Sequence, residues 1–445
     1  MNILCISLGC DKNLVDTEKM LGLLKSDGYR FTDDEAEADI VLINTCCFIG
    51  DAKEESINTI LEMAELKTCA RLKALIVTGC LAQRYREEIM EEIPEVDACV
   101  GTTAYDEIVP VIRKALEGKK EMCFLDVNRL PNVRDSRIIT TGGHYGYLKI
   151  AEGCDKHCTY CVIPKVRGSY RSYPMEELVE EAKELADAGI KELILVAQET
   201  TVYGVDLYGE KRLPALLHEL CRIPGLCWIR IQYCYPEEIT AELIEAIAAE
   251  EKVCNYLDIP IQHASDKILK RMGRRTDQEQ LKATIHLLRS RIPDIALRTT
   301  LISGFPGETE GDHQILMDFV NEMEFERLGV FAYSQEEDTP AAGYDNQVEE
   351  EVKEDRRSEL MELQQDISLE KSEAMIGRIL EVMIEGKVAD EHAYVGRTYM
   401  DAPGVDGLVF VNTEEQLLSG DFVRVKVTGA LEYDLIGEIC DESAK

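Results

Sequence analysis

Apolar and polar positions alternate in a regular way over the first 120 residues of the chain. Short apolar runs typical of buried strands occupy 2–10, 38–46, 73–80 and 97–103, and segments with helical apolar spacing occupy 15–29, 53–67, 86–93 and 105–118. Each run is followed by one of the helical segments. Repeated strand–helix units form a parallel sheet covered by helices, so we predict a small α/β domain.

The alternation resumes with different runs after residue 146. Six candidate strands occupy 147–154, 192–200, 228–236, 256–264, 297–305 and 329–337. Helical segments such as 175–189 and 236–251 lie between most of them. Six strand–helix units predict a barrel or partial barrel whose chemistry lies at the carboxyl ends of the strands. A charged helix over 349–375 is expected to lead away from this barrel.

The pattern changes again near the end of the chain. Short alternating runs at 377–388, 392–400, 407–413 and 421–439 are separated by Gly, Asp and Pro. This spacing is typical of a small antiparallel β-barrel of the OB-like kind. The predicted fold class is therefore α/β with an added β-barrel, in three domains at 1–120, 140–371 and 372–441.

Charge adds a second constraint. The 445-residue chain has 49 Lys and Arg against 85 Asp and Glu, a formal net charge of −36. Such acidity repels nucleic acid phosphates and attracts basic proteins, although it would also keep a large protein soluble. No run reaches the roughly 18 apolar residues of a membrane helix, and the amino terminus lacks the basic segment and cleavage site of a secretory signal. We expect a cytoplasmic protein with no membrane partner.

Sixteen cysteines suggest metal binding, because cytosolic proteins seldom keep disulfides. The densest group is Cys154, Cys158 and Cys161, just after the first candidate strand of the middle domain. Three thiolates on one loop can bind three irons of a 4Fe-4S cube and leave the fourth iron open. The amino and carboxylate groups of S-adenosyl-L-methionine (SAM) can chelate an open iron. The alternative is a zinc site with His157 as a candidate fourth ligand.

A second cysteine group is dispersed along the first domain. Cys10, Cys46 and Cys80 end its first three candidate strands. The carboxyl ends of parallel strands lie along one edge of the sheet, so these three thiols are expected to meet. They would hold a second iron–sulfur cluster. Cys47 could replace its neighbour Cys46, because successive strand residues point to opposite faces, and the other ten cysteines are expected to be core residues.

Several residues near the ends of the later candidate strands could line a SAM pocket. They are Gln198, Gln262, His263, Ser303 and Tyr333. The glycines of 301–308 would let the backbone approach a nucleoside closely. All of these residues could instead simply end strands and form turns. Lys165, Arg167 and Arg171 follow the cysteine loop and could face a carboxylate, although solvated surface charge is the commoner role of such residues.

Two segments around these cysteines resemble a known family. The sequence GCDKHCTYC at 153–161, with PKVRGSYRS at 164–172 and the LGC, NTC and TGC series, is similar to the methylthiotransferase family of radical SAM enzymes. The resemblance covers nearly the whole chain and includes a carboxyl-terminal TRAM domain. The segments 8–18 and 331–342 resemble the RimO type within this family. Its tRNA-modifying relatives usually carry GCQMN where this chain has GCDKN at 9–13.

The resemblance implies an enzyme with two 4Fe-4S clusters. Cys154, Cys158 and Cys161 would hold the SAM-binding cluster, and Cys10, Cys46 and Cys80 the auxiliary one. One SAM would methylate sulfur at the auxiliary cluster, and another would be cleaved to a 5′-deoxyadenosyl radical. That radical would activate the β-carbon of an aspartate in the basic small-subunit ribosomal protein S-twelve for methylthiolation. The family also requires an electron donor, such as a flavodoxin or ferredoxin.

Two other functions remain open at the level of sequence. The first is the same chemistry on tRNA adenosine. The segment 376–445 has six Lys and Arg against fourteen Asp and Glu, a net charge of −8, whereas a barrel that binds phosphates is expected to be basic. We therefore expect this acidic barrel to dock the basic ribosomal protein. The second alternative is a binding module without enzymatic activity that holds zinc at both cysteine groups.

Overall fold

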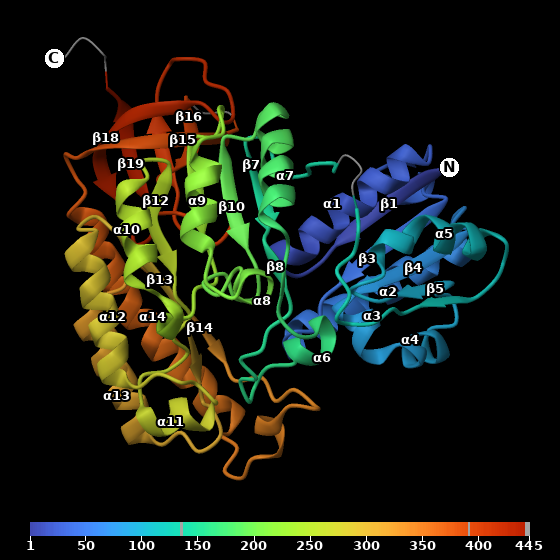
Figure 1. Cartoon of the computed structure of the whole chain (residues 1–445), viewed down its shortest axis with the longest axis horizontal. Coiled ribbons are helices and arrows are strands. Elements are labelled where there is room, and N and C mark those ends of the chain that lie inside the picture. Colours follow the sequence, from blue (N-terminus) through green and yellow to red (C-terminus); the bar gives the residue numbers. More distant parts are fainter. Residues whose placement is uncertain (134–136, 390–391, 441–445) are drawn as a thin grey trace. The chain divides into compact units, whose positions relative to one another are not determined.

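The computed structural model describes residues 1–133, 137–389 and 392–440, and the chain divides into two compact units (Figure 1). The first unit contains Met1–Thr140, Ala151–Tyr173 and Ser334–Ala342, and the second contains Thr141–Ile150, Pro174–Tyr333 and Gly343–Lys445. These units do not follow the order of the sequence. The segment with Cys154, Cys158 and Cys161 belongs to the same unit as the amino-terminal sheet.

A six-stranded parallel sheet forms the centre of the first unit, in the order β2-β1-β3-β4-β5-β6. Its strands are β1 (Asn2–Ser7), β2 (Arg30–Phe31), β3 (Ile40–Thr45), β4 (Ala74–Gly79), β5 (Ala98–Val100) and β6 (Glu121–Cys123). The four predicted strands are therefore confirmed. The two edge strands β2 and β6 were not predicted, because two or three exposed or half-exposed residues make no apolar run.

Helices cover both faces of this sheet. They are α1 (Asp11–Ser26), α2 (Gly50–Cys69), α3 (Cys80–Tyr85), α4 (Glu87–Glu92) and α5 (Ile108–Leu116). Strand residues such as Ile43 and Val77 pack with α2, α3 and α4, whereas Leu42 and Ile76 pack with α1 and α5. Alternate residues of each strand thus fill two cores, which explains why the strands are apolar throughout.

The segment Ala151–Tyr173 completes the first unit. The short strands β8 (Ala151–Glu152) and β9 (Arg171–Ser172) pair antiparallel, and the helix α6 (Ile163–Arg167) lies between them in the chain. Val162 and Val166 are buried in the same core as Leu81 of α3. The Thr102 hydroxyl donates a hydrogen bond to the Val166 carbonyl over 2.7 Å. Packing and this bond fix the segment to the amino-terminal sheet.

The second unit contains another parallel sheet, in the order β14-β13-β12-β11-β10-β7. Its strands are β7 (Tyr145–Lys149), β10 (Glu192–Val196), β11 (Trp228–Ile231), β12 (Val253–Asp258), β13 (Ala296–Ser303) and β14 (Arg327–Ala332). The sheet stays open between β7 and β14, so the partial form of the predicted barrel is confirmed.

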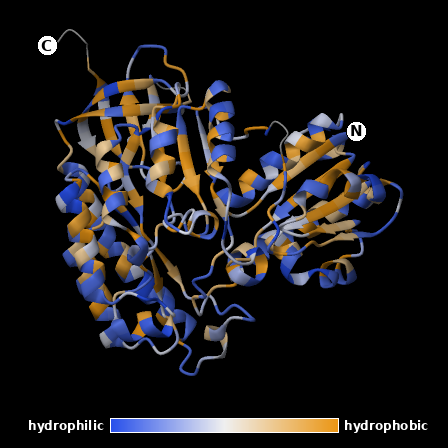
Figure 2. Ribbon diagram, viewed as in Figure 1, coloured by the Kyte–Doolittle hydropathy of each residue, from blue (hydrophilic) through white to orange (hydrophobic). Residues whose placement is uncertain are grey.

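Helices follow the strands of this second sheet. They are α7 (Met175–Asp187), α8 (Val205–Tyr208), α9 (Leu213–Cys221), α10 (Ala241–Ala249), α11 (Asp266–Arg271), α12 (Gln278–Arg291) and α13 (Glu310–Met323). Figure 2 shows apolar strands beside helices whose turns carry many polar residues. This amphipathic pattern is what the helical spacing in the sequence predicted.

The charged helix α14 (Glu350–Glu373) corrects one prediction. It does not lead away from the partial barrel but packs against β14, β13 and α13. Leu360 and Ile367 are buried, and the Gln364 amide donates to the Phe325 carbonyl over 2.9 Å. The buried positions are few and widely spaced among charged residues, so they gave no clear amphipathic pattern.

The end of the chain forms a closed five-stranded barrel, in the order β15-β16-β17-β19-β18. Its strands are β15 (Ile379–Lys387), β16 (Ala393–Arg397), β17 (Val409–Asn412), β18 (Phe422–Ala430) and β19 (Leu435–Ile439). The pairing of β17 with β19 is parallel, whereas the other pairs are antiparallel. The predicted small barrel is confirmed, and one of its pairings departs from the expected pattern.

Buried ion pairs tie this barrel to the partial barrel within the second unit. Glu192 accepts hydrogen bonds of 2.7 Å from both Arg230 and Arg397. The loop between β16 and β17 adds two more pairs, Arg327 with Asp401 and Arg298 with Asp406. The small barrel is therefore an integral part of this unit.

Of the helices that the structure describes, none is long and apolar enough to cross a membrane.

Candidate metal centre

Cys10, Cys46 and Cys80 lie where three neighbouring strands end. Cys10 directly precedes α1, Cys46 directly follows β3, and Cys80 is the first residue of α3 after β4. The strands β1, β3 and β4 are adjacent in the sheet. The sequence therefore predicted correctly that these positions lie at one edge of the sheet.

Glycines allow the close approach of these strand ends. Gly9 and Gly79 precede Cys10 and Cys80, and both have a positive φ, of 90° and 92°. A Cβ atom on Gly9 would lie 2.6 Å from Cβ of Cys46, and one on Gly79 would lie 2.5 Å from the Thr45 carbonyl oxygen. Only glycine fits at these two positions without a shift of the backbone.

The three thiols influence one another electrostatically. Burial, together with the nearby Cys80 and Cys10, raises the pKa of Cys46 to about 12. Burial also raises the pKa of Cys80, which Arg167 opposes through its charge and a hydrogen bond. Metal ligands must be thiolates, so a bound metal would have to displace these protons.

Cys47 has different surroundings from Cys46. Burial and the neighbouring Cys80 raise its pKa, whereas Arg84 lowers it. Arg84 also donates to the Cys47 carbonyl over 3.3 Å and pairs with Glu336 at 2.9 Å. Cys46 interacts electrostatically with both Cys10 and Cys80 and is therefore the better candidate ligand.

The second cysteine group forms a compact loop in the same unit. Burial raises the pKa of Cys161, and Cys158 and Cys154 add to that rise. The Cys154 amide donates to the Gly168 carbonyl over 3.1 Å, and the Cys161 amide donates to the Cys158 carbonyl over 3.1 Å. These contacts keep the loop compact, and the electrostatic effects show that the three thiols are neighbours. His157, the alternative zinc ligand, is exposed and has a positive φ of 52°.

Within the described ranges, no three His, Cys, Asp or Glu side chains surround one point closely enough to hold a single metal ion. In a 4Fe-4S cube each cysteine binds a different iron, so its ligands need not share one point. The assignment of the two cysteine groups as ligands remains a prediction.

Arg167 occupies a buried position that its sequence context did not indicate. It is only 2% exposed, and its Nη1 lies 2.7 Å from Asp16 Oδ2 and 3.4 Å from the Glu152 carboxylate. Its Nη2 donates to Asn13 Oδ1. The expectation of solvated surface charge is wrong for this residue, because its partners Asn13 and Asp16 lie on α1, far away in the sequence. Lys165 is exposed, as expected, and Arg171 is half-buried with hydrogen bonds to the Ser169 and Arg167 carbonyls.

Polar side chains also lie at the strand ends of the second unit. Gln198 follows β10 and Gln232 follows β11. Among the described residues, no hydrogen-bond partner is found for the buried Oε1 atom of either glutamine. Gln198 was a predicted SAM contact. Gln232 was not predicted, because it lies inside the candidate strand 228–236 and was read only as part of that strand. Unpaired buried acceptors of this kind suit a bound polar ligand.

Gln262 has an unusual backbone conformation. Its φ is +71°, and its amide and carbonyl bridge Thr300 and Ile302 on β13 over 2.9 and 2.8 Å. A left-handed non-glycine residue costs of order 1 kcal/mol and commonly marks a ligand site. This strain supports the prediction that Gln262 lines a site at the strand ends.

Ser303 and Tyr333 are placed at the ends of adjacent strands. Ser303 is fully buried, and its hydroxyl donates to the Lys353 carbonyl over 3.0 Å. Tyr333 donates its amide to the Ser303 carbonyl over 2.8 Å and packs edge-to-face on Phe305. The Ser303 proton thus has a partner within the protein. The roles of both residues toward SAM remain predictions.

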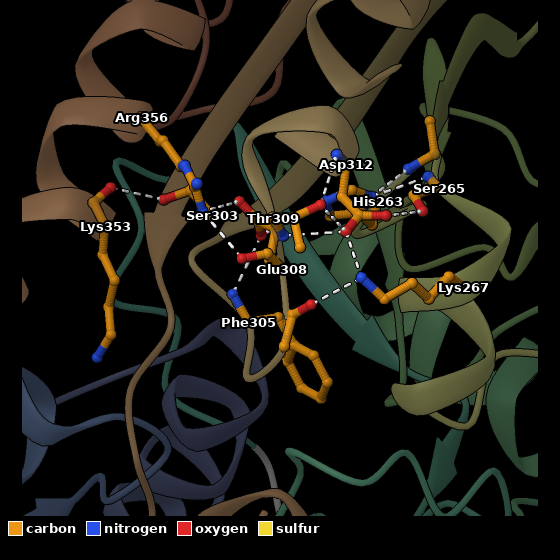
Figure 3. A network of polar contacts seen from close by, with 12 residues as sticks. His263, Ser265, Lys267, Ser303, Phe305, Glu308, Thr309, Asp312, Lys353 and Arg356 are labelled. Atoms are coloured by element: carbon orange, nitrogen blue, oxygen red, sulfur yellow. Dashed lines mark hydrogen bonds and ion pairs between the residues drawn. The ribbon is translucent and has the colours of Figure 1, made fainter. Parts of the chain in front are cut away.

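A buried network holds the loop that follows Ser303 (Figure 3). His263 Nδ1 accepts from the amides of Ala264 and Ser265 at 2.9 Å each, so the neutral ring carries its proton on Nε2. That nitrogen lies 3.5 Å from Glu308, which also pairs with Arg356 at 3.0 Å. Glu308 additionally accepts from the Phe305 amide. Glu308 therefore helps to fix the backbone of this loop, whereas His263 fixes the turn at Ala264 and Ser265.

The remaining ten cysteines were expected to lie in the core, and this holds only in part. Cys47, Cys99, Cys234 and Cys254 are buried, and Cys5, Cys123, Cys221 and Cys440 are half-buried. Cys69 and Cys227 are exposed. Cys69 is the last residue of α2 and Cys227 lies in the turn before β11, where the chain reaches the surface.

Comparison with known families matches three parts of the chain. Residues 2–101 match the uncharacterized protein family UPF0004, residues 148–320 the radical SAM superfamily, and residues 376–440 the TRAM domain. These matches define a radical SAM protein with an amino-terminal α/β domain and a TRAM barrel.

Relatives of the whole chain narrow this class. A ribosomal protein uS12 methylthiotransferase RimO from Lachnoclostridium phytofermentans is 65% identical over 98% of this chain and 99% of its own length. A RimO protein from Acetivibrio thermocellus is 52% identical over 99% and 98%. The chain belongs to the RimO family of ribosomal protein uS12 methylthiotransferases, which are radical SAM transferases.

Solved structures resemble the chain in fold. The radical SAM methyltransferase TsrM from Kitasatospora setae aligns with a TM-score of 0.55 at 15% identity, over 87% of this chain and 79% of that one. The cobalamin-dependent SAM radical enzyme OxsB aligns with a TM-score of 0.51 at 14% identity, over 81% and 56%. At such low identities the similarity concerns the fold alone.

Proposed function

We propose that this protein adds a methylthio group to the β-carbon of an aspartate in ribosomal protein uS12, using SAM and two 4Fe-4S clusters. The observation that carries the proposal is the presence of two cysteine triads in one compact unit. The substrate is inferred from the names of relatives up to 65% identical over nearly their full length.

Each triad has the chemistry that an open iron–sulfur cluster requires. Cys154, Cys158 and Cys161 would hold the SAM-binding cluster, and Cys10, Cys46 and Cys80 the auxiliary one. Both sets consist of buried or half-buried thiols, and three thiolates leave one iron of a cube free for another ligand. A zinc site built from Cys154, Cys158 and Cys161 would need a fourth ligand, and the candidate His157 is exposed.

The protein's own residues would bind and orient the clusters and SAM and shield them from solvent. When bound, the two clusters and SAM supply the electron transfer, the radical and the sulfur. Gln198, Gln232 and Gln262 offer polar groups at the strand ends for SAM, and the network of His263 and Glu308 keeps the adjoining loop in place. The burial of Cys46 and Cys80 would limit the access of water and oxygen to sulfur bound there.

Iron content tests the ligand assignment. Anaerobic reconstitution should give about eight irons per chain if each triad holds one cube. Replacing Cys154, Cys158 and Cys161 with Ala should leave about half of this iron. The matched control replaces Cys69, Cys227 and Cys5 with Ala and should keep all of it. Unchanged iron in the first variant would refute the loop as a ligand set.

Activity separates the two clusters. Replacing Cys10, Cys46 and Cys80 with Ala should preserve reductive cleavage of SAM but abolish methylthiolation, because only the auxiliary cluster is assigned to sulfur. If this variant still forms a methylthiolated product, the auxiliary triad is not the sulfur site.

Mass spectrometry of cells that lack the gene tests the substrate. We expect uS12 to lose one methylthio group and tRNA to be unchanged, which would also place the protein in the cytoplasm with the ribosome. Loss of a methylthio group from tRNA instead would support the tRNA enzyme, which the net charge of −36 disfavours.

The reducing electron must come from outside the chain. We propose a flavodoxin or a ferredoxin, because plant-type ferredoxins have potentials near −400 mV, low enough to reduce many iron–sulfur clusters. Anaerobic turnover with each purified donor tests this, and a chemical reductant serves as the positive control.

A further inference from the structure

The guanidinium of Arg167 lies in a fully protein-lined site beside the auxiliary triad. Asp16 at 2.7 Å and Glu152 at 3.4 Å are its carboxylate partners, and all three side chains are nearly inaccessible to water. The residue ends α6, the helix that follows the Cys154–Cys161 loop in the chain. A buried arginine in such a position is costly unless its charge serves its neighbours.

Asn13 fixes the direction in which this guanidinium points. Its Nδ2 donates to the Leu8 and Thr45 carbonyls, each over 3.0 Å, so its Oδ1 must face the other way. Oδ1 accepts from Arg167 Nη2 and lies 3.8 Å from Cys80 Sγ. Leu8 directly precedes Gly9, the residue before Cys10, and Thr45 directly precedes Cys46. Asn13 therefore joins the ends of β1 and β3 to Arg167.

Arg167 also interacts with cysteine sulfurs of the auxiliary triad. Cys80 forms a hydrogen bond with it, and both Cys80 and Cys10 interact electrostatically with its charge. The charge of Arg167 thus acts on the candidate ligands Cys80 and Cys10, and also on Cys46. Hydrogen bonds and positive charge at cluster sulfurs favour the reduced, more negative state of a cluster.

We propose that Arg167 is a positioning residue of the auxiliary cluster, where it orients Cys80 and Cys10 through Asn13 and raises the reduction potential of the bound cluster. This inference rests on the proposed auxiliary 4Fe-4S site. It assigns a role to a residue of the radical SAM segment in the chemistry of the amino-terminal domain.

The test uses the full chain with Cys154, Cys158 and Cys161 replaced by Ala, so that only the auxiliary cluster remains. Arg167→Gln in this background should lower the midpoint potential in an anaerobic redox titration followed by electron paramagnetic resonance. We expect at least a tenfold change in the one-electron equilibrium constant, or about 59 mV. Asp16→Asn, which keeps the arginine and removes a negative charge, should shift the potential in the opposite direction.

Two further variants separate position from charge. Arg167→Lys keeps the charge but loses the fork that reaches Asn13 and Asp16, so its potential should lie between those of the parent and Arg167→Gln. Lys165→Gln is the matched control on the same helix, where the side chain is exposed, and it should leave the potential unchanged.

The outcomes test the proposed auxiliary cluster and the proposed role of Arg167 separately. A parent variant without iron would overturn the proposed auxiliary cluster and, with it, the role of Arg167. If the parent variant holds a cluster and neither Arg167→Gln nor Asp16→Asn changes its potential, the role of Arg167 alone is overturned. If Arg167→Gln fails to fold, the shifts in Asp16→Asn and Arg167→Lys decide the matter.

Discussion

Glycine at position 79 controls how closely Cys80 approaches the neighbouring strand. Gly79→Ala should destabilise the first unit by roughly 1–3 kcal/mol, because alanine is strained at a positive φ and its Cβ would meet Thr45. Iron bound by the auxiliary triad should fall with it. Urea unfolding and iron analysis of the reconstituted variant check both effects.

Gly118 provides the matched control for this substitution. It has a φ of +77°, and no atom lies within 4 Å of an added Cβ. Gly118→Ala should therefore show only the smaller backbone cost and keep its iron. Equal losses in the two variants would mean that the crowding at Gly79 is unimportant.

At the scale of residues, the cysteines could be predicted and their surroundings could not. Cys10, Cys46 and Cys80 end apolar runs, so the geometry of a parallel sheet predicted that they lie close together. For Arg167 the sequence favours solvated surface charge over a contact with a carboxylate, because its partner Asp16 lies 151 positions away. Nothing local in the sequence indicates such a long-range pair.

The contact between the partial barrel and the small barrel depends on Glu192 of β10. Glu192→Gln should lower the free energy of unfolding by roughly 3–5 kcal/mol at pH 7, because Arg230 would remain buried without its carboxylate partner and Arg397 would keep only Glu385. Urea unfolding measures this loss. Glu180→Gln, which removes half of an exposed pair with Lys183, should cost less than about 0.5 kcal/mol.

The same carboxylate predicts a pH dependence. Despite the opposing effect of burial, Arg397 and Arg230 hold the pKa of Glu192 below its usual 4.5. Its contribution to stability is therefore complete above about pH 4.5 and is lost as the pH falls through the lowered value. The difference in unfolding free energy between the parent and Glu192→Gln should shrink in that range. A difference that stays constant from pH 7 to pH 3.5 would contradict the assignment.

At the scale of elements, those with long apolar patterns were predicted well. Short strands, and the packing of a helix whose buried residues lie among charged ones, were not. All six strands of the partial barrel were expected. The strand β2 has two residues, too few for a period, and α14 places its buried Leu360 and Ile367 among charged residues. Its packing depends on contacts with β14 and α13, which no local pattern describes.

The whole molecule is acidic, and this charge should govern the encounter with uS12. The association rate of the full chain with the basic ribosomal protein should fall about tenfold or more as salt rises from low to high concentration, since steering is screened. Stopped-flow measurements over a salt series test this. Bulk tRNA should bind weakly throughout, and tight, salt-sensitive tRNA binding would favour the tRNA enzyme.

The structure changes how the docking surface must be tested. The predicted role of the acidic small barrel remains a prediction, but some of its acidic residues are already engaged within the chain. Asp401 and Asp406 pair with Arg327 and Arg298, and Glu385 pairs with His144 and Arg397. An isolated fragment 376–445 would lack these partners, so binding is best measured on the full chain.

The placement of Ala151–Tyr173 in the first unit has a consequence for amide hydrogen exchange. Amides such as those of Cys154 and Cys161, which are hydrogen-bonded within this segment, should open together with the amino-terminal sheet. Gly79→Ala should speed their exchange, whereas Glu192→Gln should speed exchange in β10 and β11. The reverse pattern would contradict this division. The loop proposed to hold the SAM-binding cluster would then open cooperatively with the domain proposed to hold the auxiliary cluster, so that disorder at one proposed site would extend to the other.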